Sequence, residues 1–490
     1  MSITMHQVSG TASERHSTWR VTLPDVPAES DWRALYANIR QLTTGGGETS
    51  MIVRSRRVGG VSWARNRIAM STQMRVLELE IFRSIRGNWA RSLTTRLDPE
   101  GLRDAIQAAE EGLSILKIDD ISNPHNSVGS LPLLRPVLWS DATAAYDADA
   151  RTGMVESLIA PAEAAGLMSA GQFEVTADTH MTITSGSGVS IYYPVTTAQC
   201  SITVRDPQGT ASGWAGANHT DLTKIDPAAI AAVALDKCQR SLKPQAVEPG
   251  RYTVVLEPQA VGDLLAPIFG ALPAQRDAEG RNQHLLSRRI AEMGIGAFAH
   301  RNGGTRIGEQ MLDRRLMIQS DPMDPAGGFL PYVPQSGTPY RPVAWFDRGI
   351  LKELSYDVGY AVESLDHDRP LECPSSFRLS AIPGVRTTSM ADMIAKTERG
   401  VLVTRFSGIE AASDGAILCS GYTRDGLWLI EHGKVAHPIK NFRIRESPLF
   451  VLNRVLDIGE PQRVYAPGDT RVVPAIRADD FSFITLSDAI

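Results

Sequence analysis

The spacing of apolar residues changes along this chain of 490 residues, and the change limits the folds open to it. Apolar residues recur at helical spacing after Asp98-Pro99 and again over residues 151–165. Between residues 171 and 216 the period becomes two, and turn sequences interrupt it at residues 185–188 and 206–209. Helices and antiparallel strands therefore occupy separate segments, and the sequence predicts an α+β fold.

A short segment rich in proline and glycine divides the chain. Residues 243–250 read KPQAVEPG, and they follow a helix predicted to open at Asp226-Pro227. We interpret this segment as a linker between an N-terminal α/β domain, residues 1–242, and a C-terminal domain, residues 251–490. Alternation over residues 74–82 predicts a strand in the first domain, with amphipathic helices packed on its sheet.

The second domain is predicted to be β-rich and mostly antiparallel. It opens with a buried strand over residues 252–256, and a helix-like run follows Pro258. Residues 431–434 (EHGK) are expected to form a hairpin turn. The further predicted strands cover residues 341–345, 350–354, 401–406, 426–430 and 435–444.

Composition excludes several kinds of partner. The 50 basic and 55 acidic side chains give a net charge of −5, so nothing favours binding to nucleic acid or anionic lipid. The N-terminal segment is too polar for a secretion signal, and the longest apolar stretch, residues 264–274, is too short to span a bilayer. Four cysteines without metal-site spacing are expected to be reduced thiols. We therefore expect a cytoplasmic protein with no membrane contact.

Common catalytic motifs do not occur. A helical zinc hydrolase needs two histidines one turn apart, and the closest pair here, His432 and His437, straddles the predicted hairpin. The chain has neither a complete nucleophile elbow nor a phosphate-binding glycine loop. Cys419 has no base that its position in the sequence identifies.

Polar residues gather around two predicted strands, at residues 419–426 and 440–447. They could form a rim that binds a peptide or a partner subunit, or they could be a solvated face with turn residues. The rim candidates are Arg424, Asp425, Glu431, Asn441 and Arg443.

Several stretches of the chain form a recognisable set: WSDAT at 139–143, SGWA at 212–215, EPGRYTVVLEP at 248–258, YTRDG at 422–426, IEHGK at 430–434 and NFR at 441–443. Together they resemble the TldD/PmbA peptidase family, historically called modulators of DNA gyrase. The resemblance runs from about residue 50 to about residue 455, and its most specific part is the C-terminal motif.

The resemblance implies two kinds of subunit that share one fold. One kind holds zinc on a His-Glu-x-x-x-His helix shortly after the first strand of the C-terminal domain. The other kind, PmbA-like or TldE-like, lacks those ligands and pairs with the first. The heterodimer cleaves unfolded peptides and matures peptide precursors.

The zinc motif is degenerate in this chain. A Leu-Leu pair commonly precedes the motif in the zinc subunits, and Leu264-Leu265 stands at the matching place. Ala266 and Ala271 then stand at the two histidine positions, and Pro267 stands at the glutamate position. Methyl groups offer zinc no lone pair and proline cannot act as a base, so these residues cannot build the site.

The leading hypothesis is therefore a PmbA/TldE-like subunit without zinc, paired with a homologous TldD-like zinc subunit and helping to hold an unfolded peptide. No cofactor is expected in this chain, and zinc is expected in its partner. One alternative is a free-standing hydrolase that uses Cys419 or the Arg424 and Asp425 pair. Another is a peptide-binding or regulatory protein.

Overall fold

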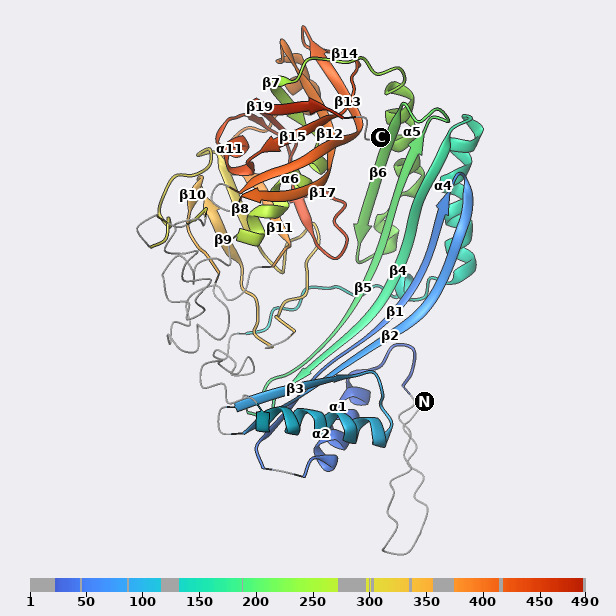
Figure 1. Cartoon of the computed structure of the whole chain (residues 1–490), viewed down its shortest axis with the longest axis vertical. Coiled ribbons are helices and arrows are strands. Elements are labelled where there is room, and N and C mark those ends of the chain that lie inside the picture. The colour runs from blue at the N-terminus through green and yellow to red at the C-terminus, as the bar shows by residue number, and fades with distance from the viewer. Residues whose placement is uncertain are drawn as a thin grey trace, which may run out of the picture.

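The computed structural model describes residues 23–44, 46–85, 88–115, 132–186, 188–271, 297–298, 300, 304–334, 337–355, 374–413 and 417–487. The first half of the chain forms one long, curved sheet, and the second half lies against the upper part of that sheet (Figure 1). The C-terminal end of the described chain lies in the second half, close to the top of the sheet.

The first sheet has six strands in the order β3-β2-β1-β4-β5-β6, and all neighbours are antiparallel. Period-two burial along these strands gives the sheet one face for packing helices and one face that is more open. The strands are β1 Glu48–Ala64, β2 Arg67–Ile85, β3 Asn88–Thr94, β4 Met168–Ile183, β5 Ser190–Arg205 and β6 Ser212–His219.

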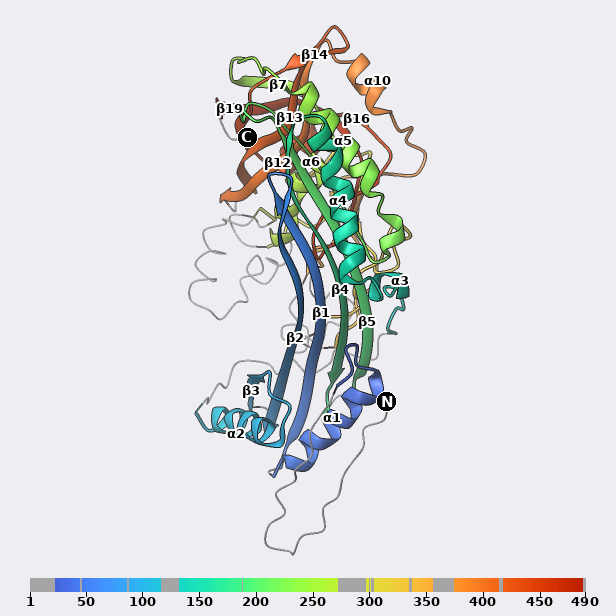
Figure 2. The ribbon, with the colours of Figure 1, turned by 90° about the vertical axis from the view of Figure 1, so that its right-hand side faces the viewer.

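Helices cover the packed face of this sheet at its two ends, and Figure 2 shows the two groups apart. Pro227 begins α5 in the favoured first-turn position, and the Asp226 carboxylate accepts a hydrogen bond from the Ala229 N–H at 3.1 Å. The helices are α1 Glu29–Leu42 and α2 Pro99–Ile115 at the lower end, and α3 Asp141–Ala144, α4 Ala148–Ala164 and α5 Pro227–Arg240 higher up, with a 3₁₀ turn at Leu222–Lys224.

The second half contains two further sheets and three described α-helices. One sheet has the order β10-β9-β8-β11-β18-β17, and the other contains β12, β7, β19, β15, β13 and β14, with β16 paired to β19. The strands are β7 Gly250–Leu256, β8 Leu316–Ser320, β9 Val343–Asp347, β10 Ile350–Leu351, β11 Phe377–Ala381, β12 Arg399–Ser413, β13 Leu418–Glu431, β14 Lys434–Pro438, β15 Phe442–Glu446, β16 Val455–Ile458, β17 Gln462–Val464, β18 Arg471–Val473 and β19 Ile476–Leu486. The helices are α6 Pro258–Ala271, α10 Met390–Ala395 and α11 Pro448–Asn453.

The second of these sheets closes on itself. β12 pairs with β7 on one side and with β13 on the other, and the path β7-β19-β15-β13 completes the ring. Closure removes the free edges that an open sheet would expose. Most pairs in the ring are antiparallel, and β12 with β7 is the parallel exception.

Two strands have ladder partners over only part of one side among the described residues. On β13, β15 pairs with residues 419–422 and β14 pairs with residues 428–431. Between these ladders the connecting residues bond to β13, since the Ile439 N–H donates to the Leu427 carbonyl and the Phe442 N–H donates to the Thr423 hydroxyl, each at 2.9 Å. On β2, β3 pairs only with residues 79–85, so residues 67–78 form an edge that can accept an added strand.

The structure confirms the predicted fold class and most predicted elements, with differences in extent. The strand predicted over residues 74–82 is the middle of a 19-residue strand, β2. The helix predicted over residues 151–165 begins earlier, at Ala148, because Asp147 caps it. The hairpin turn at residues 431–434 is confirmed by the pairing of Glu431 with Lys434.

Other expected elements needed correction. The strand predicted over residues 435–444 is two strands, β14 and β15, which bend apart at residues 439–441. Residues 350–354 form a strand only over Ile350–Leu351. The sequence patterns did not identify β1 or α1.

The predicted linker touches the second half. The Gln245 N–H donates to the Pro438 carbonyl at 3.0 Å, and the Lys440 N–H donates to the Gln245 carbonyl at 2.9 Å. The boundaries at residues 242 and 251 stay a prediction. In the described part of the chain, no helix has the length and apolar character needed to cross a bilayer.

Candidate functional site between the two halves

Helix α6 is almost entirely apolar and lies in the core of the second half. Leu264, Leu265 and Ile268 are at most 1% exposed, and they pack with residues of β7 and β12 in one hydrophobic cluster. A helix that is apolar on most sides is expected to be buried. Asp263 is its one charged residue.

Asp263 accepts hydrogen bonds on both carboxylate oxygens. The Gln259 side-chain amide donates to Oδ1 at 2.8 Å, and the backbone N–H of Phe406 donates to Oδ2 at 3.0 Å. Burial raises the pKa of Asp263 to about 6, although these donors and the nearby guanidinium of Arg405 act in the opposite direction. The carboxyl group of Asp263, in the first half of α6, therefore has a pKa of about 6.

Arg405, on β12, connects Asp263 to residues of other elements. Its guanidinium carbon lies 4.4 Å from the ring centroid of Trp214 on β6, which is a cation–π contact between the two halves. Its Nη1 lies 3.4 Å from Oδ2 of Asp425 on β13. We call Asp263, Arg405, Asp425 and Trp214 the interdomain cluster.

Asp425 lies in a bulge of the β12–β13 ladder. The register shifts between Val403 and Arg405, and Asp425 and Gly426 have φ angles of 59° and 125°. The Thr404 hydroxyl lies inside the bulge, 3.1 Å from the Gly426 carbonyl to which it can donate. A Cβ at position 426 would lie 2.5 Å from the Trp428 ring, so glycine is needed there.

The bulge orients Asp425 inward. Asp425 is 4% exposed, and its Oδ1 is buried without a hydrogen-bond partner. A buried carboxylate oxygen normally has a donor, and leaving one unmatched is costly. The oxygen can therefore accept a donor that a bound molecule or water supplies.

A pocket of 190 Å³ opens next to the bulge, between the two halves. Gly426 and Leu427 of β13 form one wall together with Asn441. Ser212 at the start of β6 and Ser241 after α5 form the opposite wall. The Ser241 hydroxyl is buried without a hydrogen-bond partner, so it can form a hydrogen bond with a molecule in the pocket.

The structure brings together three of the five predicted rim residues. Arg424 pairs with Arg405 across the ladder, Asp425 contacts Arg405, and Asn441 lines the pocket. The Asn441 side-chain oxygen accepts a hydrogen bond from the Thr423 hydroxyl at 3.1 Å.

The other two rim candidates lie elsewhere. Glu431 is exposed at the β13–β14 hairpin, six residues beyond Asp425 or about 20 Å along an extended strand. Arg443 is exposed on β15, where its guanidinium lies 3.4 Å from the Ser420 hydroxyl. Neither lines the pocket.

The three positions of the degenerate zinc motif lie on the second half of α6. Ala266 and Pro267 are partly exposed, and the helix continues through Pro267 to Ala271. None of these side chains carries a donor atom for zinc, so the residues do not fit the metal that the family resemblance implies. Among the described residues, no three His, Cys, Asp or Glu side chains gather as a metal site would require.

Cys419 and the two hairpin histidines do not join the cluster. Cys419 is fully buried and burial raises the pKa of its thiol to about 11, which disfavours the nucleophilic thiolate. His432 is exposed and its ring nitrogen lies 2.5 Å from the Glu398 carboxylate. His437 lies on β14 beside the Pro438 carbonyl.

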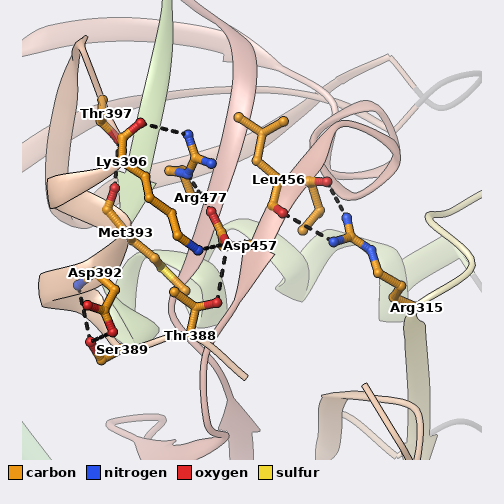
Figure 3. Close-up of polar contacts among 11 residues, drawn as sticks. Arg315, Thr388, Ser389, Asp392, Met393, Lys396, Thr397, Leu456, Asp457 and Arg477 are labelled. Carbon is orange, nitrogen blue, oxygen red and sulfur yellow. Dashed lines mark hydrogen bonds and ion pairs between the residues drawn. The ribbon is translucent and has the colours of Figure 1, made fainter. Parts of the chain in front are cut away.

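A second polar cluster in this half surrounds Asp457 on β16 (Figure 3). The side chains of Lys396 and Arg477 donate to its carboxylate at 2.8 and 2.6 Å, and the Thr388 hydroxyl lies 3.2 Å away. Burial opposes the charge of Asp457, but these donors hold its pKa below the ordinary value. Both carboxylate oxygens of Asp457 accept hydrogen bonds, so this cluster is best explained as a structural contact that joins α10, β16 and β19.

Sequence reasoning did not identify Asp263, Arg405 or Trp214 as site residues. Trp214 belongs to the SGWA stretch that carries the resemblance, and Asp263 is the single charge in an apolar run. A lone carboxylate in an apolar helix was the available signal for Asp263, because a buried charge requires partners. Arg405 had no comparable signal.

Comparisons with known proteins agree with this architecture. A search of curated proteins found no match. Three crystal structures resemble the whole chain: proteins provisionally described as modulators of DNA gyrase from Bacteroides thetaiotaomicron and Thermotoga maritima, and TldE from Thermococcus kodakarensis.

The identities to these three proteins are 17%, 15% and 16%, with TM-scores of 0.74, 0.75 and 0.75. The alignments cover 93%, 92% and 94% of this chain and 99%, 99% and 100% of the others. At these identities the likeness establishes a shared fold. The family model of the PmbA/TldA metallopeptidase C-terminal domain matches residues 249–485. Residues 249–485 of the chain therefore form a PmbA/TldA metallopeptidase C-terminal domain.

Proposed function

We propose that this chain is a PmbA/TldE-like subunit without zinc, which completes a heterodimeric metallopeptidase with a homologous zinc-bearing chain. The observation that carries the proposal is the composition of α6. Its helix is formed at the place where zinc subunits carry His-Glu-x-x-x-His, but Ala266, Pro267 and Ala271 supply no ligand and no base.

The proposed contribution of this chain is to hold an extended peptide. The proposed contact is the pocket between the two halves, which Gly426, Leu427 and Asn441 line on one side. This pocket of 190 Å³ has room for about six waters, so it fits one side chain and not a whole peptide. The Ser241 hydroxyl, which is buried in the pocket wall without a hydrogen-bond partner, offers a polar contact there.

The heterodimer also needs a surface on which the two subunits bind each other. We place this interface at the edge of β2. Residues 67–78 lack a ladder partner on one side among the described residues. Met70 and Met74, on one face of this edge, are 59% and 48% exposed. An edge strand with exposed apolar residues is a typical protein-binding surface.

The zinc-free assignment is tested by purifying the chain alone and together with a zinc-bearing homologue. We expect less than stoichiometric zinc and no turnover of an unstructured peptide for the chain alone. The mixture is expected to cleave the peptide in a chelator-sensitive reaction. Stoichiometric zinc with turnover in the isolated chain would exclude the assignment.

The peptide-holding role is tested in the reconstituted pair with two substitutions. Asn441→Leu places a bulky side chain in the pocket wall and is expected to raise KM three- to tenfold. Glu431→Gln changes an exposed residue far from the pocket and is the matched control. Equal KM values for both variants would refute a substrate role for this pocket.

The alternatives have less support. A hydrolase that relies on Cys419 would need a thiolate, and burial of that thiol raises its pKa to about 11. Arg424 lies across the ladder from Arg405, and the Asp425 carboxylate forms an ion pair with that arginine, an arrangement that supports packing between strands. A peptide-binding protein without a catalytic partner would show peptide binding at the pocket and no gain of activity on mixing.

A further inference from the structure

A second pocket lies in the N-terminal half, far along the sheet from the interdomain cluster. It has a volume of 270 Å³ and opens on the helix-covered face, between α3 and the beginning of α4. Figure 2 shows α4 beginning partway up the sheet, above the end that α1 covers. β1 and β2 form its floor, where Arg57, Gly59 and Gln73 line it.

Arg151 on α4 points into this pocket and is almost completely buried, with 2% exposure. Its Nη1 donates to the Tyr146 carbonyl at 2.9 Å and its Nη2 donates to the Gln73 side-chain oxygen at 2.7 Å. Its Nε is buried and has no hydrogen-bond partner. A Cβ at Gly59 would lie 2.4 Å from Nη1, so glycine on β1 makes room for the guanidinium.

Arg57 adds a second guanidinium. One of its nitrogens donates to the carbonyl of Ala144, a neutral acceptor. No carboxylate oxygen of the described chain lies within 4.0 Å of Arg57 or Arg151. Arg83, the other arginine that is fully buried among the described residues, has such a partner in Glu110, and the partly buried Arg378 has one in Asp324.

The charge balance around the pocket is positive. Asp147 is the one carboxylate among its lining residues, and its Oδ1 is already used to cap the Ala150 N–H at 2.8 Å. Arg75, directly across the ladder from Arg57, adds a further positive charge on the same face. Two lining guanidiniums and one carboxylate leave about one unmatched positive charge.

The backbone of α4 also makes the pocket favourable for a negative charge. Ala148 begins α4, a helix of 17 residues, and lines the pocket together with the residues just before it. The free N–H groups and the dipole of a helix N-terminus favour a negative charge there. Burial lowers the pKa of Arg151, the direction expected when a guanidinium is desolvated without a matching anion.

We propose that this pocket binds a small oxyanion, a carboxylate or a phosphate group, between Arg57, Arg151 and the first turn of α4. The guanidinium fork matches the paired oxygens of either group, and the buried Nε of Arg151 is an unused donor within it. An isolated buried charge is strongly unfavourable, and an anion bound here offsets that cost. This site is independent of the proposed peptidase role.

The test is titration calorimetry of the whole chain with inorganic phosphate and with acetate, at constant ionic strength set by chloride. We expect saturable binding of at least one of them. Arg57→Gln removes a partly exposed lining charge and is expected to weaken binding at least tenfold. Arg56→Gln is the matched control, because Arg56 precedes Arg57 on β1 and has its side chain on the opposite face. This variant is expected to bind the anion as tightly as the natural chain does.

A second variant does not depend on the folding of Arg57→Gln. Ala148→Glu adds a carboxylate in the first turn of α4, where a negative charge favours the helix but repels an anion. It is expected to keep its melting temperature and to lose at least tenfold in anion affinity. Preference for phosphate or for acetate assigns the ligand class, and either result supports the site. Binding of neither, or equal losses in Arg56→Gln and Arg57→Gln, overturns it.

Discussion

Asp263 illustrates how a partly buried carboxylate responds to its surroundings. Its pKa is about 6 in the folded chain, against an ordinary value of 3.8. The folded state therefore holds its proton to higher pH than the unfolded state, and stability is lost as pH rises from about 4 to about 6. The difference corresponds to about 3 kcal/mol at neutral pH.

The prediction concerns Asp263→Asn, which removes the titrating group. The free energy of unfolding of the variant, minus that of the natural chain, is expected to rise by about 1–3 kcal/mol between pH 4 and pH 7.5. Chemical denaturation at several pH values measures it. Glu431→Gln serves as the exposed control, and a difference independent of pH would contradict the assignment.

Arg405 is the residue on which the interdomain cluster depends. Arg405→Met leaves the carboxylate of Asp425, whose side chain is 5% exposed, without a positive partner. We expect a loss of about 2–4 kcal/mol of stability, because an uncompensated buried charge is costly. Asp425→Asn is expected to recover part of the loss in the double variant, and additive losses in a double-mutant cycle would show that the two residues do not interact.

At the scale of elements, the β12–β13 bulge and α6 place charges in a region that is otherwise apolar. The bulge turns Asp425 toward Arg405, and α6 places Asp263 near the same guanidinium. The Asp457 cluster uses a different arrangement, since it joins three elements of the same half through one carboxylate.

The Asp457 cluster predicts a stability loss at the element scale. Asp457→Asn removes a carboxylate that accepts from Lys396 and Arg477, and we expect a loss of about 2–4 kcal/mol at pH 7. The pKa of Asp457 is lowered in the folded chain, so its stabilisation is present above the ordinary carboxyl pKa and fades as pH falls below it. Denaturation at pH 7 and pH 3 should show the difference between variant and natural chain shrinking in acid. Asp392→Asn, on the exposed side of α10, is the control.

At the scale of the whole molecule, hydrogen bonds between a side chain of the first half and backbone groups of the second join the two halves. Asn218, at the edge strand β6, donates to the carbonyls of Ala466 and Asp469 at 3.2 and 3.0 Å. Its side-chain oxygen accepts the Ala466 N–H at 2.8 Å. One side chain therefore satisfies three backbone groups of the 466–469 loop.

The prediction is that Asn218→Ala loosens this junction. Three buried backbone groups would lose their partner, and we expect a loss of about 1–3 kcal/mol with faster amide exchange at Ala466. Hydrogen exchange read by mass spectrometry compares peptides covering residues 463–469 in both chains. Asn66→Ala changes a turn inside the first sheet and is expected to leave those peptides unchanged; unchanged exchange in Asn218→Ala would refute the role.

Much of the fold could be predicted from local patterns. The cap at Asp226, the alternation in β2 and the turn at residues 431–434 each act over a few residues, and the structure has an element boundary or strand at each. The candidate site could be predicted only in part. Asn441 lines the pocket and Asp425 precedes the lining residue Gly426, whereas Glu431 and Arg443 do not line it. Spacing along a strand does not show which neighbouring element each side chain will face.

The amino-acid order alone determined the α+β class, the helix caps and the loss of donor atoms at residues 266, 267 and 271, since each depends on side-chain chemistry and short-range geometry. Tertiary structure decided the closure of the barrel, the meeting of Asp263, Arg405 and Asp425, and the burial of Arg151 beside Arg57. These depend on contacts between residues that are far apart in the chain, where the free energy of burial and charge pairing is set by the whole packing arrangement.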